Sequence, residues 1–220
     1  MKTNDLIDQL GADLAPVARL ARPGRRAILW LAGSFLYLAG MLLAVILATA
    51  SAGPPEWDFV GSQLLGAVAG GLAALAAFSS VVPGHSNRAL LAAAVATAAW
   101  LVSFAALAFG PATGRSLVAA QHEWICTAMI LAGGAPLVAA LAVMLKRGAP
   151  INPMLSGLLT ALAVGLLANF TACISSPHPD VETALFWHVG TLGVLIVLCV
   201  PGSRFVLSWG GRRSKDRNRE

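Results

Sequence analysis

The sequence predicts an all-α membrane protein: a six-transmembrane-helix bundle, N-in/C-in, preceded by a short cytoplasmic amphipathic N-terminal helix. Hydrophobic residues make up 57% of the 220 residues, charged residues make up only 11%, and the mean hydropathy is +0.75. A soluble domain carries about 25% charged residues. The apolar residues also come in long blocks instead of amphipathic stripes, and the basic residues gather between alternate blocks.

The first 26 residues are polar enough to lie outside the membrane. Thr3 or Asn4 can cap a helix, and Asp5 and Asp8 favour the positive end of its dipole. Pro16 is expected to end or bend this helix. Helical spacing gives it one apolar stripe, formed by Leu6, Ile7, Leu10, Leu14 and Val17. The stripe can enter a partner's groove, pack on the bundle or lie on the membrane. Partner binding is favoured over lipid because anionic lipid would repel the acidic first part.

Six apolar stretches approach or exceed the roughly 20 residues that cross about 30 Å of hydrocarbon. They run over Ala27–Ala50, Val60–Val82, Ala89–Gly110, Cys126–Leu145, Pro153–Thr171 and Thr183–Ser203. The first is not a signal peptide, because its apolar run is far longer than a signal core of about 7–15 residues. The chain therefore divides into a cytoplasmic segment 1–26, a transmembrane domain 27–209 and a basic cytoplasmic tail 210–220.

Inside the spans, the sequence shows packing features and little charge. Pro136 is expected to kink the fourth span, and Pro201 to bend or end the sixth. The spans contain no Asp, Glu, Lys or Arg in their interiors, which weighs against an ion pump or a proton-coupled transporter. Small residues that let backbones approach closely in lipid occur in the second and fourth spans, at Gly66, Gly70, Gly71, Gly133 and Gly134.

The distribution of charge orients the bundle. All of the 15 basic residues except Arg115 flank the spans on one side, and by the positive-inside rule that side is cytoplasmic. The protein is therefore expected in the bacterial inner membrane, multi-pass, with both termini in the cytoplasm. The net charge of +5 is explained by flanks that favour anionic lipid headgroups. Membrane lipid is the expected contact, and nucleic acid is not.

Thiols and imidazoles gather at the outer ends of three spans. Cys126 begins the fourth span, Cys173 follows the fifth, and His188 lies about one turn into the sixth. His122 and His178 lie near the two cysteines in the sequence. Thiolate and imidazole are usual ligands of copper and zinc, and exposed thiols are usual redox sensors. No constitutive cofactor is expected, and the candidate ligand of this cluster is a transiently bound metal ion: copper, zinc or another heavy metal.

The spacing of these residues leaves the role of the two outer cysteines open. They can form a disulfide, act as a redox- or metal-responsive pair, or be two unrelated small apolar residues. A small metal-handling transporter, or a structural subunit of a larger complex, would also fit the chain. Catalysis is not expected, because the chain has no Cys-x-x-Cys, Gly-x-Ser-x-Gly or His-Glu-x-x-His motif.

The opening Met1-Lys2-Thr3-Asn4-Asp5-Leu6-Ile7, the six spans and the two outer cysteines together resemble NrsF-type membrane anti-sigma factors, although members usually carry an acidic residue where Asn4 stands. The resemblance implies a negative regulator of an ECF sigma factor. It also implies that Cys126 and Cys173 match the family's periplasmic pair, which responds to heavy-metal or oxidative stress. The sigma factor would be held by the N-terminal segment, through Asp5, Leu6, Ile7, Leu10, Asp13 and Leu14.

Overall fold

The computed structural model describes residues 11, 20–49, 57–84, 87–109, 120–148, 150–175 and 181–207. This part of the chain is all-helical, and each of its six helices is long and apolar enough to cross a membrane. The predicted amphipathic helix, with its six expected sigma-binding residues, and the basic tail lie outside the described residues. The helices are α2 (Pro23–Thr49), α3 (Trp57–Ser79), α4 (Arg88–Ala108), α5 (Ala120–Lys146), α6 (Pro153–Ser175) and α7 (Val181–Val206).

The helix ends differ from the predicted spans in ways that matter for the site. Helix α2 begins at Pro23, which suits a first helical position because its missing N–H would be unpaired there. Helices α5 and α6 run past the apolar stretches, so Cys126 and Cys173 both lie inside helices. The prediction that Cys173 follows its helix was wrong, because backbone hydrogen bonds continue where the hydropathy falls. Pro201 lies inside α7 and does not end it.

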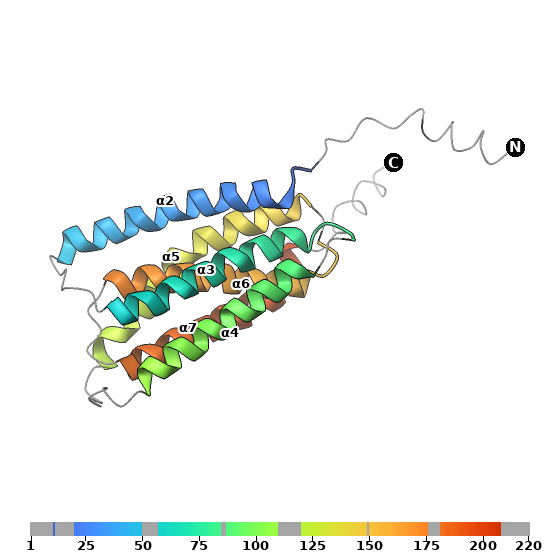
Figure 1. Ribbon diagram of the computed structural model, residues 1–220. Coiled ribbons are helices and arrows are strands. Elements are labelled where there is room, and N and C mark those ends of the chain that lie inside the picture. The colour runs from blue at the N-terminus through green and yellow to red at the C-terminus, as the bar shows by residue number, and fades with distance from the viewer. Residues whose placement is uncertain are drawn as a thin grey trace, which may run out of the picture.

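The six helices run alternately up and down, so the bundle has two distinct ends (Figure 1). The starts of α2, α4 and α6 share one end with the ends of α3, α5 and α7. We call it the basic end, because Arg25, Arg26, Arg88, Lys146, Arg147 and Arg204 lie there. The opposite end, with Cys126 and Cys173, is the cysteine end.

Helices α6 and α3 form the centre of the bundle. The apolar part of α6 is 72% buried inside the bundle and that of α3 is 44% buried, against 17–33% in the other four helices. Glycines make this packing close. A Cβ at Gly70 would lie 3.0 Å from the carbonyl oxygen of Ala163, and one at Gly66 would lie 2.7 Å from the Trp100 ring. The packing role predicted for these glycines is confirmed.

Large apolar side chains point outward, and polar side chains point inward. Phe35, Phe186 and Phe205 are 74–83% exposed, whereas Gln63, Asn169 and His188 are buried. A water-soluble protein shows the opposite arrangement, since long apolar faces are rarely left in water. The pattern suits a bundle whose outer surface meets lipid, where backbone polar groups must be satisfied within each helix.

Candidate functional site

Four polar side chains from three helices meet near the cysteine end of the bundle. They are Gln63 of α3, Asn169 and Cys173 of α6, and His188 of α7, and none is more than 4% exposed. We call these four residues the polar cluster. Asn169 and Cys173 are four positions apart, so they lie on one face of α6. Gln63 and His188 each lie about two turns from the start of their helix, which brings them to the same level.

Hydrogen bonds connect the four side chains in a chain. Asn169 Nδ2 donates to Gln63 Oε1 at 2.8 Å, which joins α6 to α3. Asn169 Oδ1 accepts from His188 Nδ1 and from the Cys173 thiol, whose sulfur lies 3.8 Å away. The same sulfur lies 3.2 Å from His188 Nδ1. Because an amide oxygen can only accept, the hydrogen between these two atoms belongs to His188 Nδ1.

Cys126 lies on the helix next to this cluster. Its side chain is 3% exposed, and the following residue, Thr127, hydrogen bonds through Oγ1 to Thr191 Oγ1 at 3.0 Å. Thr191 is almost one turn beyond His188 on α7, so α5 is tied to the helix that carries the imidazole. The sequence placed both cysteines at the outer rim. Both cysteines do lie near one end of the bundle, where the structure buries their side chains, and all three cysteines are thiols.

The chemistry open to the cluster is that of a thiol beside an imidazole. These two groups can together bind a soft cation, and a thiol can be oxidised. Among the described residues, no three His, Cys, Asp or Glu side chains are close enough to hold a metal ion. The side chain of His122 and the whole of His178 lie outside the described residues. A metal site that includes them stays a prediction.

A second buried polar group lies at the basic end. Arg26 is 5% exposed, its Nη2 donates to the carbonyl oxygen of Met144, and its guanidinium carbon lies 4.8 Å from the centre of the Phe78 ring. Arg26 thus joins α2 to α5 and to the last turn of α3. A Cβ at Gly148 would also meet Leu20, Val81 and Arg26, so the chain that enters α2 packs at this place.

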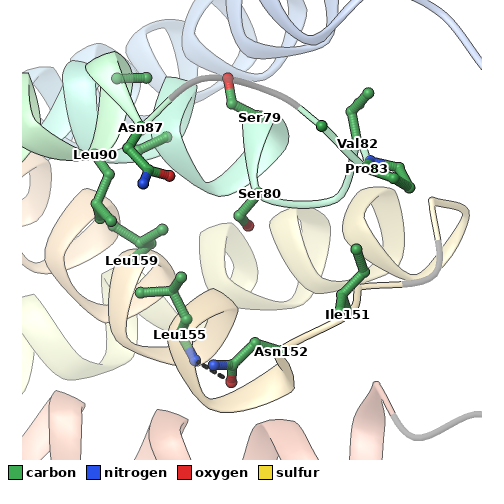
Figure 2. A pocket seen from close by; sticks show the side chains of 13 residues that line it. Ser79, Ser80, Val82, Pro83, Asn87, Leu90, Ile151, Asn152, Leu155 and Leu159 are labelled. Atoms are coloured by element: carbon green, nitrogen blue, oxygen red, sulfur yellow. Dashed lines mark hydrogen bonds between the residues drawn. The ribbon is translucent and has the colours of Figure 1, made fainter.

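A cavity of about 260 Å³ opens at the basic end, between the end of α3, the start of α4 and the start of α6. Figure 2 shows Leu90, Leu155 and Leu159 together on one side of it, with Ser80 nearby. Asn152 closes the lower edge and accepts a hydrogen bond from the backbone N–H of Leu155 at 3.2 Å, as a residue that caps the start of α6 does (Figure 2). The lining of the cavity is therefore mainly apolar, and its polar side chains are Ser79, Ser80, Asn87 and Asn152.

Sequence reasoning missed Gln63, Asn169 and the role of Arg26. Gln63 and Asn169 are amide side chains inside apolar spans, and polar residues within a membrane span are candidates for function. The prediction considered only charged residues inside the spans, and both of these amides are neutral. Arg26 was counted only among the basic residues that flank the spans, because a sequence does not show that a ring from another helix lies beneath it.

Comparison with known protein families gave a match over most of the chain. The family described as NrsF, negative regulator of sigma F, matches residues 10–209 of the chain. Neither the curated proteins nor the solved structures contain a match. The matched range includes all six helices and every residue of the polar cluster.

Proposed function

Since the chain belongs to the NrsF family of negative regulators of sigma F, we propose that it is an inner-membrane anti-sigma factor for a sigma factor of the ECF class. The family is one of regulators, and a sigma factor is the partner that its description implies. The observation that carries the proposal is a family match over residues 10–209 on a chain with six helices that can cross a membrane.

In this proposal both termini lie in the cytoplasm, and the N-terminal segment holds the sigma factor. The described Arg and Lys residues at the helix ends favour this orientation, because they gather at the end of the bundle where α2 begins and α7 ends. The apolar stripe of Leu6, Leu10 and Leu14 would contact the sigma factor, with Asp13 at its border and Asp5 in the first turn of the helix. A bound sigma factor would be kept from RNA polymerase.

The cysteine end would receive the signal from the periplasm. A thiophilic divalent cation that binds Cys173 replaces the S–H bond by a sulfur–metal bond and releases one proton to solvent. His188 would offer a second ligand through Nδ1, which lies 3.2 Å from the sulfur, once the hydrogen on Nδ1 has moved to Nε2. Cys126 would be the other responsive thiol, on a helix already tied to α7.

Helix α3 offers a path from the signal to the sigma factor. It carries Gln63 in the polar cluster, and it carries Phe78 beneath Arg26 at the basic end. A shift of α3 would therefore change the contacts at the base of the N-terminal segment. A change from about 1% to 99% free sigma factor requires a signal worth about 5.5 kcal/mol between the two states. One interhelical hydrogen bond is too weak for this, at about 0.6 kcal/mol on average in membranes, so the main energy has to come from ligation or oxidation of the thiols.

The sensing proposal is tested by replacing the thiols. The Cys126→Ser, Cys173→Ser double variant should repress a reporter gene of the sigma factor normally but lose its induction by CdCl₂ or diamide. Cys199→Ser is the matched control, because Cys199 lies toward the basic end of α7 and should leave induction unchanged. Normal induction in the double variant would reject the sensing role.

The partner proposal is tested at the N-terminal stripe. Leu6→Glu and Leu10→Glu should each express the reporter without any inducer, because a charge on the stripe opposes burial in a partner's groove. Ala12→Glu places the same charge on the opposite face of the predicted helix and should keep repression. Equal repression by all three variants would reject the contact. Pull-down of the sigma factor by the full chain gives the direct measurement.

A further inference from the structure

The buried amide pair of the polar cluster is not needed for either thiol to react, so it requires its own explanation. Asn169 is 4% exposed and Gln63 is 0% exposed, and both lie inside helices apolar enough to cross a membrane. A buried amide has to be hydrogen bonded, because an apolar surrounding offers it no water. Asn169 meets this need through Gln63, His188 and Cys173 at once.

We propose that Asn169 and Gln63 are positioning residues that set the sensitivity of the Cys173–His188 site by occupying both groups in the resting protein. The inference rests on the proposed function, since it names what tunes the same sensing thiol. Asn169 Oδ1 receives both the thiol hydrogen and the His188 Nδ1 hydrogen. A cation bound between the sulfur and Nδ1 has to displace this oxygen, and the hydrogen on Nδ1 has to move to Nε2.

Gln63 determines which end of the Asn169 amide faces the site. Because Asn169 Nδ2 donates to Gln63 Oε1, the oxygen of the amide is left facing Cys173 and His188. Without that acceptor, the amide can turn by half a rotation and present its NH₂ group to the imidazole. The hydrogen bond at Nδ1 decides which ring nitrogen carries the hydrogen, so Gln63 acts on His188 through Asn169.

A purely structural pair behaves differently when both of its members are replaced. Removing one partner leaves a buried polar group unsatisfied, whereas replacing both with apolar groups of similar shape is nearly neutral for stability. A Gln63→Met, Asn169→Leu double variant therefore keeps α3 packed on α6 while it frees Cys173 and His188 from the amide. If the pair only held helices together, this variant would sense as the parent does.

The experiment uses the full chain in membrane vesicles, with Cys126→Ser and Cys199→Ser so that Cys173 is the only thiol. The rate of alkylation by N-ethylmaleimide and the CdCl₂ concentration that halves this rate are measured. The double variant should be alkylated about fivefold faster and be protected at about fivefold less CdCl₂, the effect of roughly one net hydrogen bond. Thr160→Val is the control, because Thr160 is a buried residue of α6 whose hydroxyl donates to the carbonyl oxygen of Ser156 in its own helix.

The proposal would be overturned if a folded double variant had the alkylation rate and the protecting CdCl₂ concentration of the parent. It would also be overturned if the single variants changed these two values and the double variant restored them. Folding is checked by the thermal midpoint in detergent. Should the double variant not fold, Gln63→Met alone decides. It leaves α6 and α7 unchanged and should shift both quantities in the same direction, and no shift would overturn the proposal. Failure of the sensing function is separate: it would appear as normal CdCl₂ induction in Cys173→Ser.

Discussion

At the cysteine end of the bundle, side chains from three helices meet through hydrogen bonds, whereas at the basic end helix backbones touch directly and one cation packs on a ring. Asn169 bonds to Gln63 at 2.8 Å in the first region. In the second, a Cβ at Gly157 of α6 would lie 2.6 Å from the Cys199 carbonyl oxygen of α7. A ligand can exchange a hydrogen bond, but it cannot exchange a close backbone contact. The cysteine end therefore contains contacts that a ligand can exchange, and the basic end contains contacts that hold helices together.

The strongest test of this difference is a methyl group at the close contact. Gly157→Ala should lower the free energy of unfolding by about 1–3 kcal/mol, because the added Cβ meets a backbone carbonyl that cannot move aside. The thermal midpoint in detergent measures the effect, at about 2–4 °C per kcal/mol. Gly190→Ala on α7 is the control, because nothing lies within 4 Å of its added Cβ. Equal midpoints for the two variants would mean that the basic end is not tightly packed.

At the cysteine end, Asn169→Leu should lower the free energy of unfolding by about 1–2 kcal/mol, because it leaves the buried Gln63 amide without its partner. The double variant that also carries Gln63→Met should lose less unfolding free energy than the sum of the losses in the two single variants. The difference gives the coupling energy of the pair, which is about 0.6 kcal/mol on average for membrane proteins and up to about 1.7. Strictly additive costs would show that the two amides are not coupled. Thermal unfolding of the four proteins completes the cycle.

Arg26→Ala probes the other contact of the basic end. It removes the cation from the face of Phe78 and the donor from the Met144 carbonyl, and it should cost about 1 kcal/mol. Arg25→Ala removes the neighbouring exposed arginine and should change stability by less than about 0.5 kcal/mol. The losses of unfolding free energy of the two variants, measured in one detergent, show whether the buried arginine contributes more to stability than the exposed one. A larger loss for Arg25→Ala would contradict the assignment.

The smallest effect is expected at the bond between α5 and α7. Thr127→Val keeps the shape of the side chain and removes its hydrogen bond to Thr191, at a cost of about 0.6 kcal/mol. This variant sharpens the comparison, because it weakens the cysteine end without touching the polar cluster. Reporter induction by CdCl₂ should keep its midpoint. A shift of about fivefold, the size expected for CdCl₂ protection in the Gln63→Met, Asn169→Leu double variant, would mean that any loosening of this end changes sensitivity.

The sequence was enough to predict the six spans and their order. It also predicted that basic residues gather at one set of helix ends. Each of these depends on residues that are close together along the chain, because transfer of a helix into hydrocarbon is a sum over its own side chains. The roles of Gly66 and Gly70 in packing could be read for the same reason. The helix ends were less accurate, since a helix continues through polar residues as long as its backbone bonds are made, as at Cys173.

Only the tertiary structure decided which polar groups meet. Gln63 and Asn169 are 106 positions apart, and Arg26 and Met144 are 118 apart, so no local pattern pairs them. The pairing depends on which face of α3 turns toward α6, and that rotation is set by where small residues allow the two helices to approach. Hydropathy is nearly the same on all faces of such helices. For that reason the sequence determined that the chain forms these helices, and their packing alone placed a thiol, an imidazole and two amides in one site.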